Sequence, residues 1–189
     1  MRLSNIDLNN TPWYLKPFFW NQKRKYGQVL IPSLVWAKSP SIFISLALLY
    51  GAIDRKSSPI SPELRSLITV RVSQINWCRF CVDINSATLI KRSGNDAKCL
   101  ELDNWQESTM FSDKERAALS YAEKVTYTDQ HPDDAGFVEL KKHFTEQAIM
   151  ELTALIAFQN MSSKFNSALD IAPQGFCTIT AKKTEKPTL

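Results

Sequence analysis

Apolar residues recur at helical spacing along most of the chain, and capping residues mark where several helices begin. Ser39 and Pro40 precede the apolar run IFISLALLYG. Ser61 and Pro62 stand in the same way before LRSLITVRV. A serine N-cap followed by proline at the first helical position is typical of a helix start. The pattern therefore predicts two helices that begin at these prolines.

Two further helices are predicted in the second half of the chain. Ser112 and Glu115 have the spacing of a capping box ahead of AALSYAEKV. The residues that follow Thr145, EQAIMELTALIAFQNMSSKFNSAL, are apolar on most sides of a long helix and are expected to be largely buried. The segment LITVRVSQI is β-branched enough to suggest a strand, but its flanks are helical. We therefore expect an all-α fold.

Glycine and proline positions indicate how the helices are connected. Gly51, Gly94 and Gly136 are expected to interrupt the helices, and only five glycines occur in the chain. The early stretch TPWYLKPFFWNQKRKYGQVLIPSLVWAKSP is rich in aromatics and interrupted by prolines, which predicts short helices packed across the core or a partner subunit. We expect one helical domain over residues 1–180 and a disordered polar tail at 181–189.

Composition narrows the classes of function. The 189 residues are 44% hydrophobic, which fits one globular domain with a real core. With 23 basic and 19 acidic residues the net charge is only +4, too little for nucleic-acid binding. The N-terminus MRLSNIDLNN lacks a secretory signal, and the run IFISLALLYGAI is shorter than the roughly 18 residues that span a bilayer. We expect a cytoplasmic protein that binds neither nucleic acid nor membrane.

The segment INWCRFCVDINSATLIKRSG places Cys78 and Cys81 three residues apart. In a reducing compartment such a pair is typical of catalysis or metal binding rather than of a structural disulfide. On a helix the two sulfurs share a face and are close enough to form a disulfide. If Asn76 is the N-cap, Cys78 lies in the first turn, where the helix macrodipole and the nearby Arg79 favour a thiolate. A redox pair is the interpretation that this context favours.

Two other interpretations of the cysteine pair stay open. Two neighbouring cysteines can simply be small core residues. A zinc site needs about four ligands, and the further histidines and cysteines form no matching motif; they are His131, His143, Cys99 and Cys177. We expect no metal and no cofactor, since nothing in the sequence identifies a flavin or nicotinamide site.

The string LRSLITVRVSQINWCRFCVDINSATLIKRSG resembles the carboxymuconolactone decarboxylase and alkylhydroperoxidase-D-like family. The matching features are an apolar run, RVSQIN, a C-x-x-C with an aromatic residue before the second cysteine, and a helix that closes at glycine. The later segment FTEQAIMELTALIAFQNMSSKFNSAL is similar to the family's later helix, whereas residues 1–60 match only loosely.

The resemblance implies an alkylhydroperoxidase-D-like helical bundle that assembles into a homo-oligomer, either a trimer or a hexamer. It also implies that Cys78 and Cys81 reduce a small peroxide or exchange disulfides with a dithiol electron donor, in antioxidant defence. Two alternatives are a family member with little catalytic activity and a lactone decarboxylase-type enzyme. The decarboxylase branch generally lacks the cysteine pair, so the pair favours the redox branch.

The sequence departs from the family's proton relay at two positions. Asn85 stands where redox members have a histidine, and Ser66 stands where they have a glutamate. Both side chains can hydrogen-bond a water, but neither takes a proton near neutral pH. Glu63, one turn before Ser66, is the nearest replacement on the same helix, although it can equally complement the macrodipole. The candidate catalytic residues are Cys78, Cys81, Glu63, Asn85 and Ser66.

Other polar residues receive structural expectations. Asp83 is expected at solvent or at an interface, pointing away from the cysteines. Glu151 is expected either beside a cationic partner or near a polar pocket. Asn160 and Asn166 do not share one helix face well, which predicts different contacts for the two. Core or subunit contacts are expected for the tryptophans of the first segment, Trp13, Trp20 and Trp36.

Overall fold

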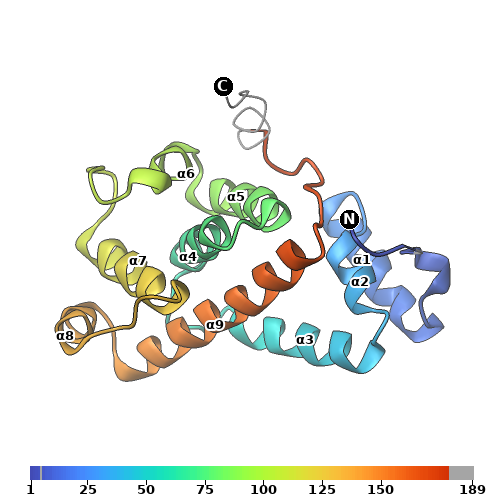
Figure 1. The fold of residues 1–189 in the computed structure, drawn as a ribbon, viewed down its shortest axis with the longest axis horizontal. Helices are drawn as coiled ribbons and strands as arrows, with labels where there is room; N and C mark the ends of the chain where they lie inside the picture. Colours follow the sequence, from blue (N-terminus) through green and yellow to red (C-terminus); the bar gives the residue numbers. More distant parts are fainter. Residues whose placement is uncertain (5, 179–189) are drawn as a thin grey trace.

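The computed structural model describes residues 1–4 and 6–178, and all regular elements in these ranges are helical (Figure 1). The all-α prediction is confirmed, while the predicted tail at 181–189 lies outside the described residues. The α-helices are α1 (Lys16–Tyr26), α2 (Ile31–Trp36), α3 (Pro40–Ile53), α4 (Pro62–Ile75), α5 (Arg79–Ser93), α6 (Ala97–Glu101), α7 (Asp113–Thr126), α8 (Asp134–His143) and α9 (Glu146–Ala168). Three short 3-10 helices accompany them, at Leu8–Asn10, Trp13–Leu15 and Leu102–Asn104.

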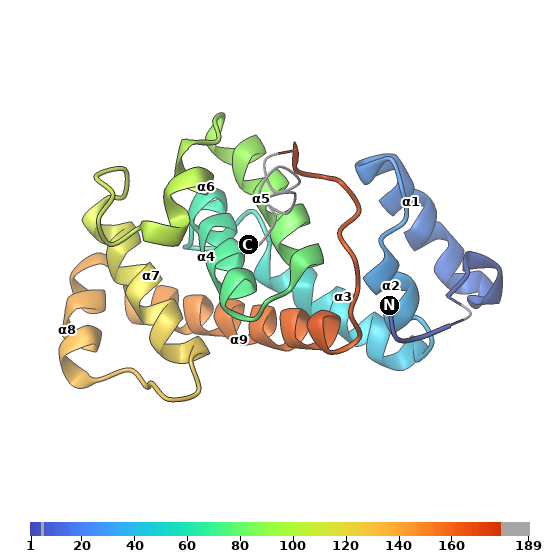
Figure 2. The ribbon, with the colours of Figure 1, turned by 45° about the horizontal axis from the view of Figure 1, so that its top comes forward.

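Helix α4 lies at the centre of the fold and packs against α5, α7 and α9 (Figure 2). Its Leu67, Ile68, Val70 and Val72 have no solvent exposure. These residues belong to the segment that could have suggested a strand. Because three helices cover α4 on different sides, burial of its β-branched residues outweighs their weak helix propensity. The prediction of a helix here is confirmed.

The predicted helix starts agree with the structure. Ser39, Ser61, Ser112 and Thr145 are the N-caps of α3, α4, α7 and α9. Ser112 forms both bonds of the capping box with Glu115. The side chains of Ser61, Ser112 and Thr145 each accept a free backbone N–H group of the first turn. Ser39 makes no such bond, and α3 starts with proline at its first position.

The glycine predictions were correct at one position and wrong at two. Gly94 ends α5 with a left-handed φ of +79°, a conformation that glycine adopts without a steric penalty. Gly51 instead lies within α3, and Gly136 lies in the first turn of α8. Asp133 is the N-cap of α8, and its carboxylate accepts the N–H of Gly136 at 2.7 Å. A good N-cap thus allows a glycine inside the first turn.

Helices α1 and α2 lie at one end of the molecule, α7 and α8 lie at the other, and α9 runs between them (Figure 2). Trp36 of α2 stacks on Phe165 of α9 with ring centroids 3.5 Å apart, which joins the N-terminal helices to the rest of the fold. Trp13 and Trp20 are 79% and 66% exposed, so they are not core residues of the single chain. Subunit contacts remain the prediction for these two.

Over the described ranges, the structure contains no helix with both the length and the apolar character required to cross a bilayer.

Candidate functional site

The cysteine pair lies where α4 turns into α5. Cys78 is the N-cap of α5, its Sγ accepts the N–H of Cys81 at 3.2 Å, and the two residues are disulfide-bonded with Cα atoms 5.2 Å apart. The prediction that Asn76 caps α5 was wrong. Asn76 ends α4, where its N–H bonds the Val72 carbonyl at 3.1 Å, and Trp77 turns the chain with a φ of +54°. The cap is therefore a sulfur rather than an amide oxygen.

A cavity of about 300 Å³ lies beside the second cysteine. Cys81 lines this cavity, whereas Cys78 does not belong to its wall. The walls come from α1, α2 and α3 on one side and from α5 and α9 on the other. Most of the lining is apolar and aromatic, with rings from Phe18, Tyr26, Trp36, Phe43, Tyr50, Phe80 and Phe158. Both cysteines are nearly inaccessible from bulk solvent, so the cavity is the space that adjoins the Cys81 sulfur.

An asparagine of α9 contacts the cavity-facing sulfur. Asn166 is 2% exposed, lines the cavity and donates from Nδ2 to Cys81 Sγ at 3.2 Å. Its Oδ1 is buried and has no hydrogen-bond partner among the described residues. Asn160 instead contacts Asn76 and Thr126, at 2.8 and 3.0 Å, so the predicted division of roles between the two asparagines is confirmed. The sequence analysis did not predict the contact between Asn166 and the Cys81 sulfur. The one sequence signal for it was a polar residue inside an otherwise apolar helix.

A buried serine of α4, Ser73, is hydrogen-bonded to two amide side chains that line the cavity. Ser73 is fully buried, and its Oγ accepts from Asn85 Nδ2 at 3.2 Å and from Gln159 Nε2 at 2.9 Å. The same hydroxyl donates to the Thr69 carbonyl. Asn85 and Gln159 both line the cavity. The structure thus brings Cys81 and Asn85 to one cavity, and it fixes the amide of Asn85 as a hydrogen-bond donor to Ser73.

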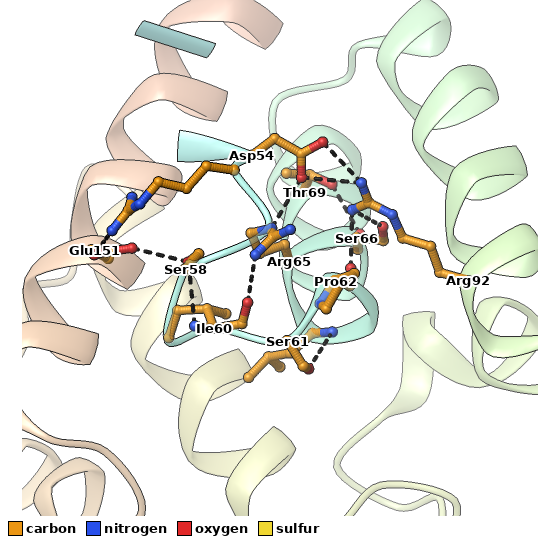
Figure 3. Close-up of polar contacts among 12 residues, drawn as sticks. Asp54, Ser58, Ile60, Ser61, Pro62, Arg65, Ser66, Thr69, Arg92 and Glu151 are labelled. Atoms are coloured by element: carbon orange, nitrogen blue, oxygen red, sulfur yellow. Dashed lines mark hydrogen bonds and ion pairs between the residues drawn. The ribbon is translucent and has the colours of Figure 1, made fainter. Parts of the chain in front are cut away.

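Ser66 belongs to a separate charged network between α3, α4 and α5. Figure 3 shows Asp54 between two guanidinium groups. Arg65 Nε lies 3.0 Å from an Asp54 oxygen, and Arg92 contacts both carboxylate oxygens at 3.0 and 2.9 Å. Arg92 also donates to Ser66 Oγ at 3.0 Å. The hydroxyl that replaces the family's glutamate is therefore occupied by an arginine that is itself paired with Asp54.

Glu63 lies in the first turn of α4, and it does not line the cavity beside Cys81. Its carboxylate pairs with Lys98 at 2.9 Å, and Lys98 also pairs with Glu115 at 2.6 Å. Burial opposes ionisation of Glu115, but its hydrogen bonds with Lys98 and Ser112 lower the pKa of the carboxyl below its usual value. Glu63 and Ser73 are ten positions apart on α4, about 15 Å along the helix axis. The structure does not bring Glu63 to the cysteines.

Asp83 was predicted to face solvent or an interface, and that prediction was wrong. Asp83 is 1% exposed, and its carboxylate accepts the backbone N–H groups of Gln174, Gly175 and Cys177 at 2.9, 2.8 and 2.7 Å. These bonds hold residues 174–177 against α5. The contact point on α5, Asp83, is two positions after Cys81. The contact is long-range, so no local pattern could reveal it.

Arg79 and Glu151 each have an oppositely charged partner. Arg79 was expected to favour a cysteine thiolate. It bonds Asp170 at 3.0 Å on the surface and lowers the pKa of that carboxyl.

Glu151 was predicted to lie either beside a cationic partner or near a polar pocket, and the structure gives it a cationic partner. It contacts Arg55 and accepts from Ser58 at 2.9 Å (Figure 3), and the hydrogen bond from Arg55 lowers the pKa of Glu151.

In the part of the chain that the structure describes, no three histidine, cysteine, aspartate or glutamate side chains form a group that could hold a metal ion.

The comparisons with known proteins agree on family and fold. The model of the carboxymuconolactone decarboxylase family matches residues 42–124. The uncharacterized protein YnjA of Escherichia coli (strain K12) is 44% identical over 177 residues, which cover 94% of this chain and 97% of YnjA. The crystal structure of the debrominase Bmp8 has a TM-score of 0.81 and 25% identity, and the match covers 95% of each chain.

A second solved structure, a peroxidase-related protein from Ralstonia eutropha with the alkylhydroperoxidase AhpD core, has a TM-score of 0.82 at 23% identity, with 93% of each chain covered. This likeness concerns the fold, and it confirms the helical architecture implied by the resemblance of the C-x-x-C segment. The close match to YnjA extends through the N-terminal segment that resembles the family only loosely. The chain therefore belongs to the carboxymuconolactone decarboxylase family and has its alkylhydroperoxidase-D-like helical fold.

Proposed function

We propose that this protein is a thiol-dependent peroxidase in which Cys78 and Cys81 cycle between a dithiol and a disulfide. The observation that carries the proposal is the pairing of the two cysteines at the start of α5, with one of them on the wall of a cavity. A buried sulfur on a ligand-sized cavity can meet a small molecule, while its partner lies within bonding distance. The peroxidase-related neighbours of the same fold are consistent with this chemistry.

The reaction can be written so that atoms and electrons balance. The Cys81 thiolate attacks one oxygen of a peroxide ROOH, the O–O bond breaks, and ROH leaves after it gains a proton. Cys81 becomes a sulfenic acid, and Cys78 then displaces water from it to form the disulfide. An external dithiol returns both cysteines to thiols by exchange through a mixed disulfide. The peroxide is reduced to an alcohol and water, and the dithiol is oxidised.

Cys78 is proposed as the more acidic thiol. Its sulfur occupies the N-cap position and accepts a backbone N–H, and a thiolate there gains from the partial positive charge of the helix N-terminus. Cys81 lies one turn further into α5, but Asn166 donates a hydrogen bond to its sulfur. In the dithiol form, the Cys81 thiol gives its proton to solvent when the thiolate forms. The departing alkoxide then takes a proton from solvent rather than from a histidine and glutamate relay.

The test is consumption of peroxide in the presence of several dithiols, with the natural chain compared with Cys78→Ser and Cys81→Ser. We expect turnover only with both cysteines, because either serine variant prevents disulfide formation. A cytoplasmic setting, in which dithiol reductants are available, is part of the proposal. Equal turnover in all three proteins would reject it.

Two alternatives within the family give different results in the same assay. A lactone decarboxylase-type enzyme would retain its activity without either cysteine. A scaffold with little catalytic activity would consume no peroxide with any dithiol. A second thiol-based candidate is reductive dehalogenation, favoured by the likeness to the debrominase Bmp8 and by the aromatic cavity beside Cys81. Release of bromide from a brominated pyrrole, in the presence of a dithiol, would detect it.

A further inference from the structure

One buried amide side chain is hydrogen-bonded to the sulfur of Cys81. Asn166 is 2% exposed, and its Nδ2 lies 3.2 Å from Cys81 Sγ. A disulfide sulfur carries no hydrogen and can only accept, so the amide presents its NH2 group to the sulfur rather than its oxygen. Within the described residues, no second side chain donates a hydrogen bond to this sulfur. Asn166 is therefore in direct contact with an atom that reacts.

The residues that stand at the family's relay positions, and their nearest replacement, have other partners. Asn85 donates to a buried serine hydroxyl. Ser66 and Glu63 are each bonded to a cationic side chain outside the cavity. An ordinary cysteine thiol has a pKa of about 8.5 and is mostly protonated at neutral pH, so a nucleophilic cysteine needs a group that favours its thiolate. The amide of Asn166 is in the position to do this for Cys81.

The backbone around Asn166 is fixed by contacts on both sides. The preceding residue, Phe165, stacks on Trp36 of α2. The carbonyl group of Asn166 accepts the N–H of Ile171 at 3.0 Å, just beyond the end of α9. A donor that is already in place when negative charge develops needs no reorganisation during the reaction.

Stability of the fold does not account for an amide at this position. The Oδ1 atom of Asn166 is buried and has no hydrogen-bond partner among the described residues. A buried acceptor without a partner is unfavourable for folding. A leucine, which has a similar shape, would avoid that cost in an interior that is mostly apolar. The contact with sulfur is the feature that the amide provides and leucine would not.

We propose that Asn166 is a catalytic residue whose amide stabilises the Cys81 thiolate and so prepares it to attack the peroxide. The N–H···S bond is charge-assisted when the sulfur is an anion, so it favours the thiolate over both the neutral thiol and the disulfide. Cys81 thus loses its proton at a lower pH, and the disulfide with Cys78 is reduced more easily. The inference rests on the proposed function, since it assigns the group that activates its nucleophile, and atoms and electrons balance as in the scheme above.

The first measurement is the rate at which iodoacetamide alkylates Cys81 as a function of pH, in proteins that also carry Cys78→Ser. Mass spectrometry of the Cys81 peptide separates this thiol from the others. Asn166→Leu removes the donor, and it should raise the midpoint of the profile by about one pH unit, because a hydrogen bond to an ionised group changes an equilibrium constant about tenfold or more. Asn160→Leu is the matched control. Its amide lies on the same helix but bonds other side chains, so the midpoint should not move.

The second measurement is the reduction potential of the Cys78–Cys81 pair at several pH values, in chains that keep both cysteines. Asn166→Leu should lower the potential by about 30 mV, the equivalent of a tenfold change for two electrons, at pH values where Cys81 is ionised. The difference from the natural chain should disappear at low pH, because both proteins then hold the neutral thiol. A purely structural effect of the substitution would shift the potential equally at every pH.

A second variant, Asn166→Ala, removes the same donor without filling its place, and it is used if circular dichroism shows that Asn166→Leu has lost its fold. An unchanged midpoint and an unchanged potential in the folded variant would overturn the assignment. Neither measurement uses peroxide. Peroxide turnover by the natural chain with an unchanged midpoint would therefore reject only the role of Asn166. A shifted midpoint in a protein that consumes no peroxide would support that role and reject the peroxidase function.

Discussion

At the residue scale, the structure separates two positions that sequence reasoning had joined. Asn85 lines the cavity with Cys81, whereas Glu63 pairs with Lys98 at the opposite end of α4. If Glu63 took part in proton transfer, its loss would lower turnover by about 10² or more. We predict instead that Glu63→Gln leaves peroxide turnover within about twofold. We also predict that it costs about 0.5 kcal/mol of stability, the usual effect of a partly exposed ion pair.

The measurement is steady-state turnover together with urea unfolding of Glu63→Gln. Asn85→His is the converse variant, because it restores the histidine of the redox members next to Cys81. A rise in turnover in Asn85→His would show that the cavity geometry still accommodates a base. A hundredfold loss of peroxide turnover in Glu63→Gln would contradict this prediction and support proton transfer through Glu63.

Residue types and short spacings allowed the cysteine pair and the N-caps of α3, α4, α7 and α9 to be read from the sequence. The partners of the side chains could not be read in the same way. Asn166 reaches Cys81 across 85 positions, and Asp83 reaches the 174–177 segment across more than 90. Such contacts are set by the packing of whole helices, which a local pattern does not encode.

At the element scale, a single carboxylate fixes the C-terminal segment beside the start of α5. Asp83 accepts three backbone N–H groups from residues 174–177. Asp83→Ala would leave those donors without a buried acceptor, and we predict a loss on the order of 3 kcal/mol in the free energy of unfolding. Limited proteolysis should then cut the 171–178 segment much faster than in the natural chain.

Asp83→Asn is the control for this prediction, because it keeps the shape and one acceptor oxygen. It should lose less stability than Asp83→Ala and show intermediate proteolysis. Equal stability of all three proteins would mean that the segment is held by its other contacts, such as the bond from the backbone N–H of Ile31 to the Gln174 side chain at 2.8 Å.

At the scale of the whole molecule, α3 exposes an apolar surface. Its Ile42, Ile44, Leu48 and Leu49 are 48%, 41%, 70% and 45% exposed, although the helix is apolar along most of its length. Surfaces of this kind mark association sites. We predict a homo-oligomer, a trimer or a hexamer, with α3 in the interface. Light scattering at micromolar concentration should give several times the mass of 21.5 kDa.

Leu48→Lys should shift this equilibrium toward the monomer, since it places a charge on the most exposed apolar position of α3. Lys56→Glu, on the nearby exposed loop, serves as the control that should leave the mass unchanged. A monomer mass for the natural chain in light scattering would contradict the predicted oligomer. It would not affect the proposed chemistry of the cysteine pair.

The central claim, that Cys78 and Cys81 act as one redox pair, is tested most directly by counting thiols after a single turnover. The reduced chain has four cysteines. One equivalent of hydroperoxide should lower the number of titratable thiols under denaturing conditions from four to two and yield one equivalent of alcohol. Mass spectrometry should place the new disulfide between Cys78 and Cys81. Four thiols and intact hydroperoxide after the incubation, or a disulfide between other cysteines, would contradict the account.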